Sequence, residues 1–187
     1  GPVRAADVRP GGGGMTAAGG TVPVFYSDDY VLAAYTFDTT RKARRVAESL
    51  RTRPIPGIAL EAPAPVDAAA LCTIHDAAYV EAVRTGVPRG LAGSNGFDWD
   101  PGLWTMACAS TGGAVAAALR ALETGGVAGS LSSGLHHARR GHGAGFCTFN
   151  GLALGARRAI AAGAGRILVL DLDAHCGGGT AEILSGE

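Results

Sequence analysis

From residue 21 onward, short apolar runs alternate with longer amphipathic stretches, which is the pattern of an α/β protein. Apolar extended runs predict strands at residues 22–25, 127–132 and 166–172. Proline residues punctuate the connection at residues 54–65 and predict a loop that ends in a short helix. The remaining pattern predicts helices at residues 40–50, after His75 and Asp76, at 103–122, from the capping residue Asn150 to about residue 162, and at 179–184.

The run Ile167-Leu168-Val169-Leu170 is apolar without alternation, as in strands that helices cover on both faces of a parallel sheet. With the strand at 127–132 and the helix between them, it predicts a βαβ unit. The expected fold class is therefore α/β, a three-layer parallel sheet with helices on both faces, incomplete at the C-terminus. Because only residues 179–184 follow as a helix, residues 15–187 alone are expected to aggregate, to form oligomers or to depend on further chain.

The first twenty residues have the composition of a leader, and the folded domain is expected at residues 21–187. Gly1-Pro2 resembles a scar of tag removal, and residues 11–14 are all glycine before Met15. No apolar stretch follows the early arginines, so no signal peptide is expected. Residues 103–122 are rich in small residues and contain Arg120, which favours a buried helix over a membrane span.

Composition narrows the classes of function. The 16 basic and 16 acidic residues give a net charge of zero, which offers no case for a nucleic-acid partner or a membrane surface. Lys42 is the single lysine, and the abundance of Ala, Gly and Arg is typical of a GC-rich bacterial genome. The four cysteines form no CxxC pair, so they are expected to be reduced thiols in a cytoplasmic protein.

Two polar clusters follow the strands predicted at 127–132 and 166–172, at the sheet edge where α/β proteins bind ligands. In extended chain Asp171, Asp173 and His175 would share one face, with Leu172 and Ala174 toward the core. Two crowded carboxylates and an imidazole suit Zn²⁺, with Fe²⁺ as another first-row candidate. The alternative is that one aspartate caps the last helix and His175 is merely buried.

His136 and His137 form the second cluster. Adjacent side chains point to opposite sides unless the backbone turns, so the pair is better suited to move protons beside a metal than to bind it. Asp171 is available to fix the tautomer of one ring. The alternative is a polar loop, flanked by Arg139 and Arg140, that carries no chemistry.

The other candidates are weaker. His75 at a helix start is expected to be structural, and His142 between two glycines is expected to be solvated. Phe146, which follows Gly145, either packs in the core or lines a channel to the metal. No Gly-x-Ser-x-Gly elbow, Walker A loop or dinucleotide-binding fingerprint occurs.

The sequence resembles the histone deacetylase family, including its bacterial amidohydrolases, within the arginase/deacetylase superfamily. The likeness rests on Gly-Leu-His-His-Ala-Arg at residues 134–139, Gly-Phe-Cys at 145–147 and Leu-Asp-Leu-Asp-Ala-His at 170–175. The last motif is similar to the class IV type. Weaker matches lie at residues 74–79 and 96–113. The likeness runs from about residue 22 to the last residue and corresponds to the N-terminal portion of the family domain.

By position, the resemblance implies that Asp173 and His175 bind Zn²⁺ and that His136 and His137 transfer protons. It implies that Asp171 pairs with His136 and helps to hold a structural K⁺. Gly145 and Phe146 would line the channel for the acyl-amine chain.

Three departures from the family accompany the likeness. The family's third metal ligand, an Asp, and its carbonyl-polarising Tyr lie beyond Glu187. Gly178 stands where many relatives carry Asp or Asn to orient the second histidine, so His137 lacks that partner. Cys176 replaces a common His or Gln.

The activity that the resemblance implies is zinc-dependent hydrolysis of an N-acyl amine, such as acetyl-lysine or an acetylpolyamine, with His137 accepting a proton from a metal-activated water. One alternative is a ureohydrolase of the same fold with two Mn²⁺, although Gly177 stands where its Asp-Ala-His-x-Asp motif needs the second Asp. The other is a degenerate deacetylase-like scaffold that binds a partner or an acylated ligand without turnover. Gly178 favours the scaffold.

Overall fold

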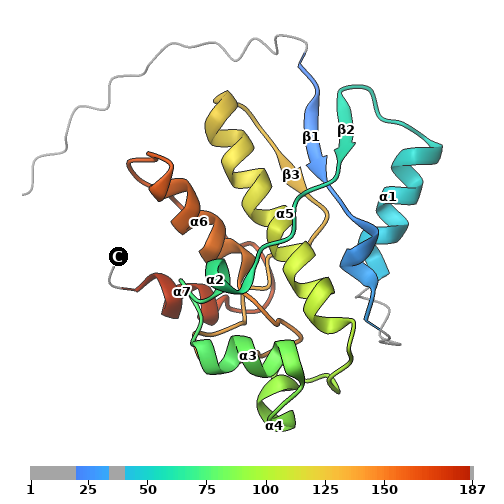
Figure 1. Ribbon diagram of the computed structural model, residues 1–187. Helices are drawn as coiled ribbons and strands as arrows, with labels where there is room; N and C mark the ends of the chain where they lie inside the picture. Colours follow the sequence, from blue (N-terminus) through green and yellow to red (C-terminus); the bar gives the residue numbers. More distant parts are fainter. Residues whose placement is uncertain (1–19, 34–40, 186–187) are drawn as a thin grey trace, which may run out of the picture.

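A parallel three-stranded sheet lies at one end of the molecule, and helices surround it (Figure 1). The computed structural model describes residues 20–33 and 41–185, so the expected leader lies outside the described residues except for its last position. The strands are β1 (Val22–Phe25), β2 (Ile58–Glu61) and β3 (Gly129–Ser130), in the order β2-β1-β3. In Figure 1 the strands lie between helices α1 and α5. The predicted α/β class with a parallel sheet is confirmed.

The predicted helices are present, with small shifts at their ends. The helical elements are η1 (Asp28–Val31), α1 (Lys42–Thr52), α2 (Ala68–Leu71), α3 (Ala77–Thr85), α4 (Arg89–Ala92), α5 (Leu103–Thr124), α6 (Gly151–Ala161) and α7 (Gly178–Leu184). Asn150 caps α6 as predicted, since its Oδ1 accepts a hydrogen bond from the N–H of Ala153 at 3.0 Å. The short elements η1 and α4 are additional to the prediction.

Strand β2 lies in the proline-rich connection that was predicted to be a loop. It pairs in parallel with β1, with Val22 opposite Ile58 and Phe25 opposite Glu61. Pro56 and Pro63 lie outside the four paired residues, so neither proline removes a donor from the ladder. The crossover β1–α1–β2 is therefore a βαβ unit, which the sequence pattern did not predict.

The strand predicted at residues 166–172 is wrong for this structure. The segment forms no regular secondary structure, and its backbone makes no hydrogen bond to a strand in the described part of the chain. Leu168, Leu170 and Leu172 are exposed by 86%, 73% and 84%. An apolar run specifies side chains that avoid water, but a strand also needs a neighbour for its backbone. The neighbouring β3 is only two residues long and pairs with β1.

Helix α5 is the centre of the packing, as expected for a buried helix rich in small residues. It contacts α6, η1, β1 and β3. A side chain on Gly113 would overlap the hydroxyl of Tyr30, so the absence of a Cβ permits this close approach. Among the described residues, no helix combines the length and the apolar character needed to cross a bilayer.

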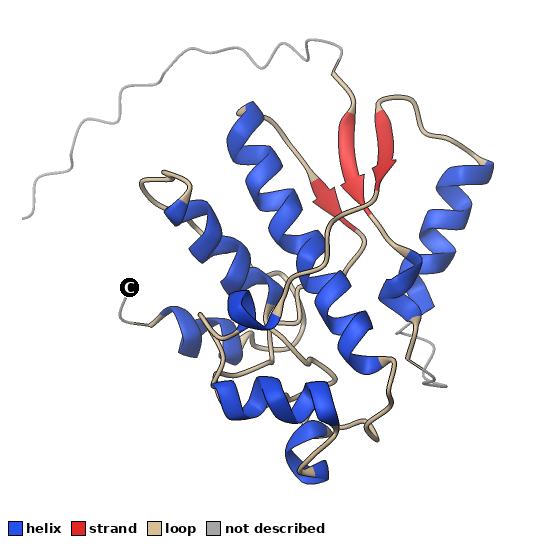
Figure 2. Ribbon diagram, in the orientation of Figure 1, coloured by secondary structure: helices blue, strands red, loops and turns tan. Residues whose placement is uncertain are grey.

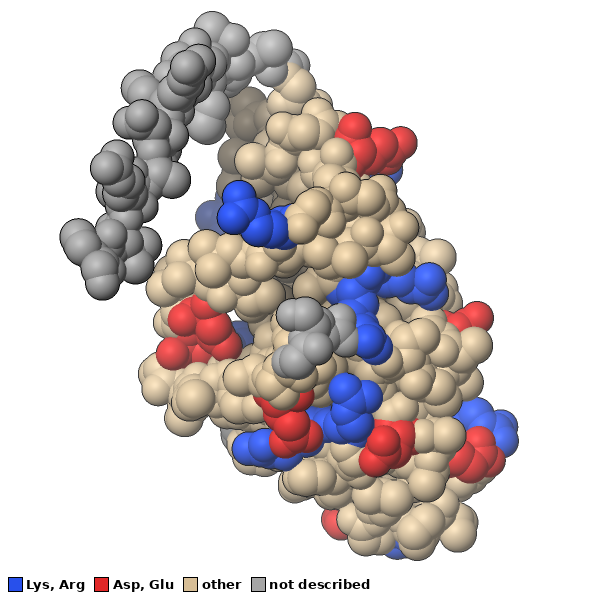
Figure 3. Space-filling view, turned by 90° about the vertical axis from the view of Figure 1, so that its left-hand side faces the viewer, with Lys and Arg blue, Asp and Glu red and all other residues tan. Residues whose placement is uncertain are grey.

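Charge is distributed without a dominant sign on the face that Figure 3 shows. Acidic and basic side chains are interspersed there among neutral residues. This arrangement agrees with the net charge of zero for the whole chain.

The exposed leucines lead to a prediction about association. Apolar side chains on a segment with unpaired backbone invite strand pairing between molecules, so the 187-residue chain is expected to self-associate as its concentration rises. Replacing two of them (Leu168→Lys with Leu170→Lys) should shift sedimentation velocity profiles toward the monomer. Val127→Lys is the matched control, because Val127 is 67% exposed and lies outside the segment. A monodisperse wild-type monomer that melts cooperatively would contradict the prediction.

Candidate active site

Three loops, at residues 131–137, 145–148 and 171–175, meet at one cavity of about 790 Å³. Met106, Ala107 and Ser110 of α5 also line the cavity, and Figure 2 draws the connecting loops in tan. Every residue predicted for the site lines this cavity: His136, His137, Gly145, Phe146, Asp171, Asp173 and His175. Tertiary structure thus brings together two clusters that lie 34 or more residues apart in the sequence.

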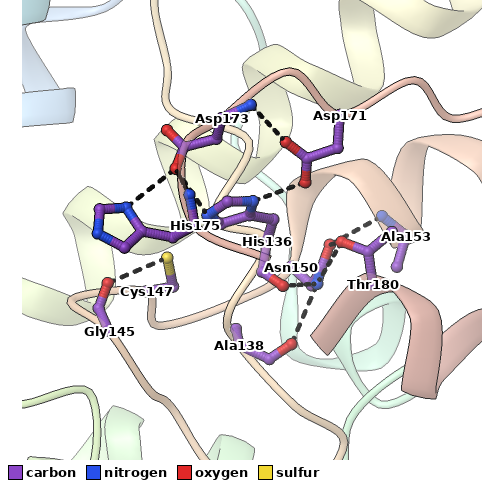
Figure 4. Close-up of polar contacts among 10 residues, drawn as sticks. All are labelled: His136, Ala138, Gly145, Cys147, Asn150, Ala153, Asp171, Asp173, His175 and Thr180. Atoms are coloured by element: carbon purple, nitrogen blue, oxygen red, sulfur yellow. Dashed lines mark hydrogen bonds and ion pairs between the residues drawn. The ribbon is translucent and has the colours of Figure 1, made fainter. Parts of the chain in front are cut away.

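A short hydrogen bond joins the two clusters. His136 Nδ1 lies 2.6 Å from Asp171 Oδ2, and its Nε2 lies 3.9 Å from Asp173 Oδ2 (Figure 4). Because an ionised carboxylate only accepts, the proton of this bond is on Nδ1 of the ring. The hydrogen bond from His136 lowers the pKa of Asp171, and the N–H of Asp173 adds to the effect. His136 is therefore held in one orientation, with Nε2 on the side of Asp173.

The second aspartate of the cluster binds within its own loop. Asp173 Oδ2 accepts from the backbone N–H of His175 at 2.7 Å and lies 3.1 Å from its ring Nδ1. These two interactions lower the pKa of Asp173. The side chains of Asp173 and His175 remain 51% and 79% exposed, and Leu172 faces solvent instead of the expected core. The segment is an exposed loop, not the end of a buried strand.

Asp173 and His175 fit a first-row divalent cation in donor chemistry. A carboxylate oxygen and an imidazole nitrogen already lie side by side, as mixed ligation of zinc requires. A catalytic zinc takes three protein ligands. In residues 20–33 and 41–185, no group of three His, Cys, Asp or Glu side chains is close enough to hold an ion. The described residues thus supply two suitable donors and not a closed site.

The tandem histidines turn both rings into the same cavity. Their ring centroids are 4.1 Å apart, although adjacent side chains would diverge in extended chain. The turn begins at Leu135, whose φ of 59° is left-handed, a conformation that costs a residue with a side chain about 1 kcal/mol or more. Burial, His136 and His175 together lower the pKa of His137.

The ring of His137 has no hydrogen-bond partner among the described side chains. Gly178 has no side chain that could orient the ring. The guanidinium of Arg139 lies where a side chain at 178 would extend, with Nη2 3.2 Å from the position of a Cβ. The position of the His137 ring is limited instead by its close contact with Gly145, where a Cβ would overlap the imidazole.

A buried amide holds the histidine turn from behind. Nδ2 of Asn150 lies 3.0 Å from Ala138 O, 3.4 Å from His136 O and 3.1 Å from Thr180 Oγ1 (Figure 4). The N–H of Thr180 donates to His136 O at 3.1 Å. A side chain on Gly179 would overlap Ala138 O, so α7 packs directly on the backbone of the turn. The sequence predicted Asn150 only as a helix cap.

His75 is structural, as expected. It is 2% exposed, its Nδ1 donates to Arg139 O at 2.8 Å, and its Nε2 accepts from the N–H of Asn150 at 3.1 Å. These partners require a neutral ring with the proton on Nδ1. Burial lowers the pKa of His75, which favours that neutral form. His142 is exposed, also as expected.

Two phenylalanines form one wall of the cavity. Phe146 is 52% exposed, so it is not a core residue, and its ring centroid lies 4.8 Å from that of Phe97. Phe146 has a left-handed φ of 65°, and its N–H donates to Asn95 O at 2.7 Å. Buried Asn95 also accepts from the N–H of Phe97 at 3.0 Å. In the sequence, Phe97 lies within a stretch that matches the family only weakly. Its aromatic partner Phe146 is 49 residues away, so no local pattern connects the two rings.

Comparisons with known proteins agree with this geometry. The family model described as Histone deacetylase domain matches residues 36–187. An uncharacterized protein of Picosynechococcus sp. is 38% identical over 123 residues, which are 65% of this chain and 41% of the relative. A protein of Methanothermobacter thermautotrophicus named "Probable deacetylase" is 38% identical over 120 residues, covering 59% of this chain and 34% of the relative.

A solved structure has the same arrangement of elements. The crystal structure of the HDA15 HD domain superposes with a TM-score of 0.76 at 25% identity, and the match covers 89% of this chain and 50% of that chain. The present chain therefore spans half or less of the length of these relatives.

The pKa of His75 leads to a pH prediction. Its folded-state pKa lies below the ordinary value of 6.5, so the unfolded chain binds more protons and stability falls as the pH drops below 6.5 toward the folded-state pKa. Urea unfolding of the wild type between pH 7 and pH 5 should show this loss. His75→Gln removes the titration and should flatten the slope, though not abolish it, because the pKa of His137 is also lowered.

Exposed His142 provides the control for this measurement. His142→Gln should leave the slope unchanged. An equal slope in the wild type and His75→Gln would show that His75 does not titrate as its buried contacts indicate.

Proposed function

Because this chain belongs to the histone deacetylase family, we propose that it carries part of a zinc-dependent site that hydrolyses an N-acyl amine. One observation carries the proposal: the His136–Asp171 hydrogen bond of 2.6 Å places the histidine pair beside Asp173 and His175 in a single cavity. Proton-transfer groups and metal donors are thus within reach of one bound molecule.

Asp173 and His175 are the residues that would hold zinc, together with a third ligand that the described residues do not provide. When bound, zinc supplies Lewis-acid polarisation of an amide carbonyl and lowers the pKa of water toward 7. Asp171 stays charged through its bond to His136, since that bond lowers the pKa of its carboxyl group. The same carboxylate is the proposed contact for a structural K⁺.

The two histidines have different environments and would have different roles. His137 has a lowered pKa and a ring without a hydrogen-bond partner among the described side chains, so it is neutral and able to accept a proton. It would later return that proton to the leaving amine. His136 is fixed by Asp171, which keeps the proton on Nδ1 and leaves Nε2 toward the cavity.

The shape of the wall indicates the kind of substrate. Phe97 and Phe146 present apolar ring surface beside the histidines, and Gly145 brings the loop against His137. An unbranched alkyl chain with an acylated amine at its end suits such a wall. Acetyl-lysine and acetylpolyamines both have this form.

A binding scaffold without turnover is the second candidate. It is supported by Gly178, which gives His137 no orienting group and leaves that space to the guanidinium of Arg139. A ureohydrolase with two metals has less support. A side chain at Gly177 would overlap Asp171 Oδ2, so the second aspartate of that motif has no room.

Metal stoichiometry and turnover, both measured on the full-length protein, test the proposal. One zinc per chain, lost in Asp173→Asn and His175→Ala, with hydrolysis of an acetyl-lysine peptide or an acetylpolyamine, is the expected result. Binding of zinc and a hydroxamate without hydrolysis would refute the enzymatic function and support the binding scaffold. Two metal ions per chain would favour the ureohydrolase, and no metal binding would refute the zinc proposal.

The first kinetic prediction concerns the proton-transfer pair. His137→Gln removes the group that accepts and returns the proton, so kcat should fall by about 100-fold or more. His142→Gln is the control, because His142 is exposed and does not line the cavity. Turnover by a His136→Ala, His137→Ala double variant at the wild-type rate would rule out this assignment.

The second kinetic prediction concerns the aromatic wall. Phe97→Ala removes a ring that stacks on Phe146, so KM for an acetylated amine should rise about fivefold while kcat changes less. Phe97→Tyr keeps the ring and should retain most of the affinity. If KM is unchanged in the alanine variant, Phe97 does not contact the substrate.

A further inference from the structure

A single carboxylate joins α7 to the histidine turn outside the buried amide network. Oε2 of Glu182 accepts from Nη1 of Arg139, and Oε1 accepts from the backbone N–H of Arg140 at 3.2 Å. Both contacts hold the chain immediately after His137. The pairing with Arg139 lowers the pKa of Glu182, so the carboxylate is charged at neutral pH.

The arginine of this pair lies over the first turn of α7. Its Nη2 is 3.2 Å from where a Cβ on Gly178 would lie, so the guanidinium spans from the turn to the start of the helix. The side chain of Arg140 reaches the same helix, with Nη2 3.5 Å from Ile183 O. Helix α7 is thus bound to residues 139 and 140 through Glu182 and Ile183, and to His136 through the N–H of Thr180.

Helix α7 directly follows the segment that carries the proposed metal donors, residues 171–177. Within that segment Asp173 binds His175 and the N–H of Asp173 binds Asp171, so these bonds are local. At its front end the segment is joined to His136, by the hydrogen bond that Asp171 accepts and by the 3.9 Å contact between Asp173 Oδ2 and His136 Nε2. Its back end is continuous with α7, so the placement of α7 sets the direction in which the loop returns.

We propose that Glu182, through Arg139, is a positioning residue that aligns the metal-binding segment with the histidine pair. The ion pair keeps α7 at a set distance and angle to the turn that carries His137. Both proposed metal donors then lie on the same side of the cavity as the proton-transfer group. The proposal rests on the proposed zinc function for its purpose, but its main test needs no metal.

Amide hydrogen exchange on the metal-free full chain is that test. Glu182→Gln keeps an oxygen for the N–H of Arg140 but removes the charge that pairs with Arg139. The amide of Thr180, which donates to His136 O, and the amides of Asp173 and His175 should exchange about fivefold faster, the effect expected for losing a half-exposed ion pair. Amides in the middle of α5 should be unchanged.

A matched control comes from α3. Glu81 and Arg84 form an exposed ion pair with two hydrogen bonds, and Glu81→Gln removes the same charge away from the site. It should leave exchange at Thr180 unchanged. The reversed pair, Arg139→Glu with Glu182→Arg, should restore part of the protection lost in Glu182→Gln.

Zinc affinity of the full-length protein, measured by chelator competition, provides the second readout. Glu182→Gln should weaken it about fivefold, and Glu81→Gln should not. Unchanged exchange at Thr180, faster exchange throughout α5, or faster local exchange with unchanged zinc affinity would each overturn the proposal. If the wild-type chain takes up no zinc, the proposed function fails, and the exchange result alone decides whether Glu182 positions the segment.

Discussion

The relative placement of three chain segments depends on the fully buried side-chain amide of Asn150. Its oxygen caps α6, and its nitrogen binds carbonyl oxygens of the histidine turn and the hydroxyl of Thr180 at the start of α7. Removing this amide would leave several buried polar groups without partners, each at a cost of about 1–3 kcal/mol. The turn, α6 and α7 therefore have one arrangement in which all of these groups are satisfied.

Hydrogen bonds from buried side chains and backbone also hold the strained backbone near the cavity. Leu135 and Phe146 both have left-handed φ angles, which side-chain-bearing residues adopt only when their surroundings leave no alternative. The turn after Leu135 is held by Asn150 and His75, and the loop at Phe146 is held by Asn95. Strain at these positions turns both histidine rings and one phenylalanine toward the same space, which ordinary extended chain would not do.

The two halves of the proposed site are supported very differently. The proton-transfer half rests on buried hydrogen bonds and on direct backbone contact with α7. The metal half is an exposed loop whose donors bind mainly each other, preceded by leucines that face solvent. The histidine turn is held rigidly, whereas the metal-binding segment is anchored only at its two ends. Glu182 lies in the helix at one of these ends, which is the physical basis for its proposed role.

The sequence by itself determined the local elements and the chemistry. Periodicity and capping residues identified β1, α5, α6 and α7, and the run of residues 171–175 predicted the proposed metal donors, because these signals depend on neighbours in the chain. Tertiary structure alone decided the rest. It placed β2 beside β1, left residues 166–172 without a strand partner, and stacked Phe97 on Phe146. Pairing between distant backbones and side chains depends on which surfaces meet in space, and no local pattern records that choice.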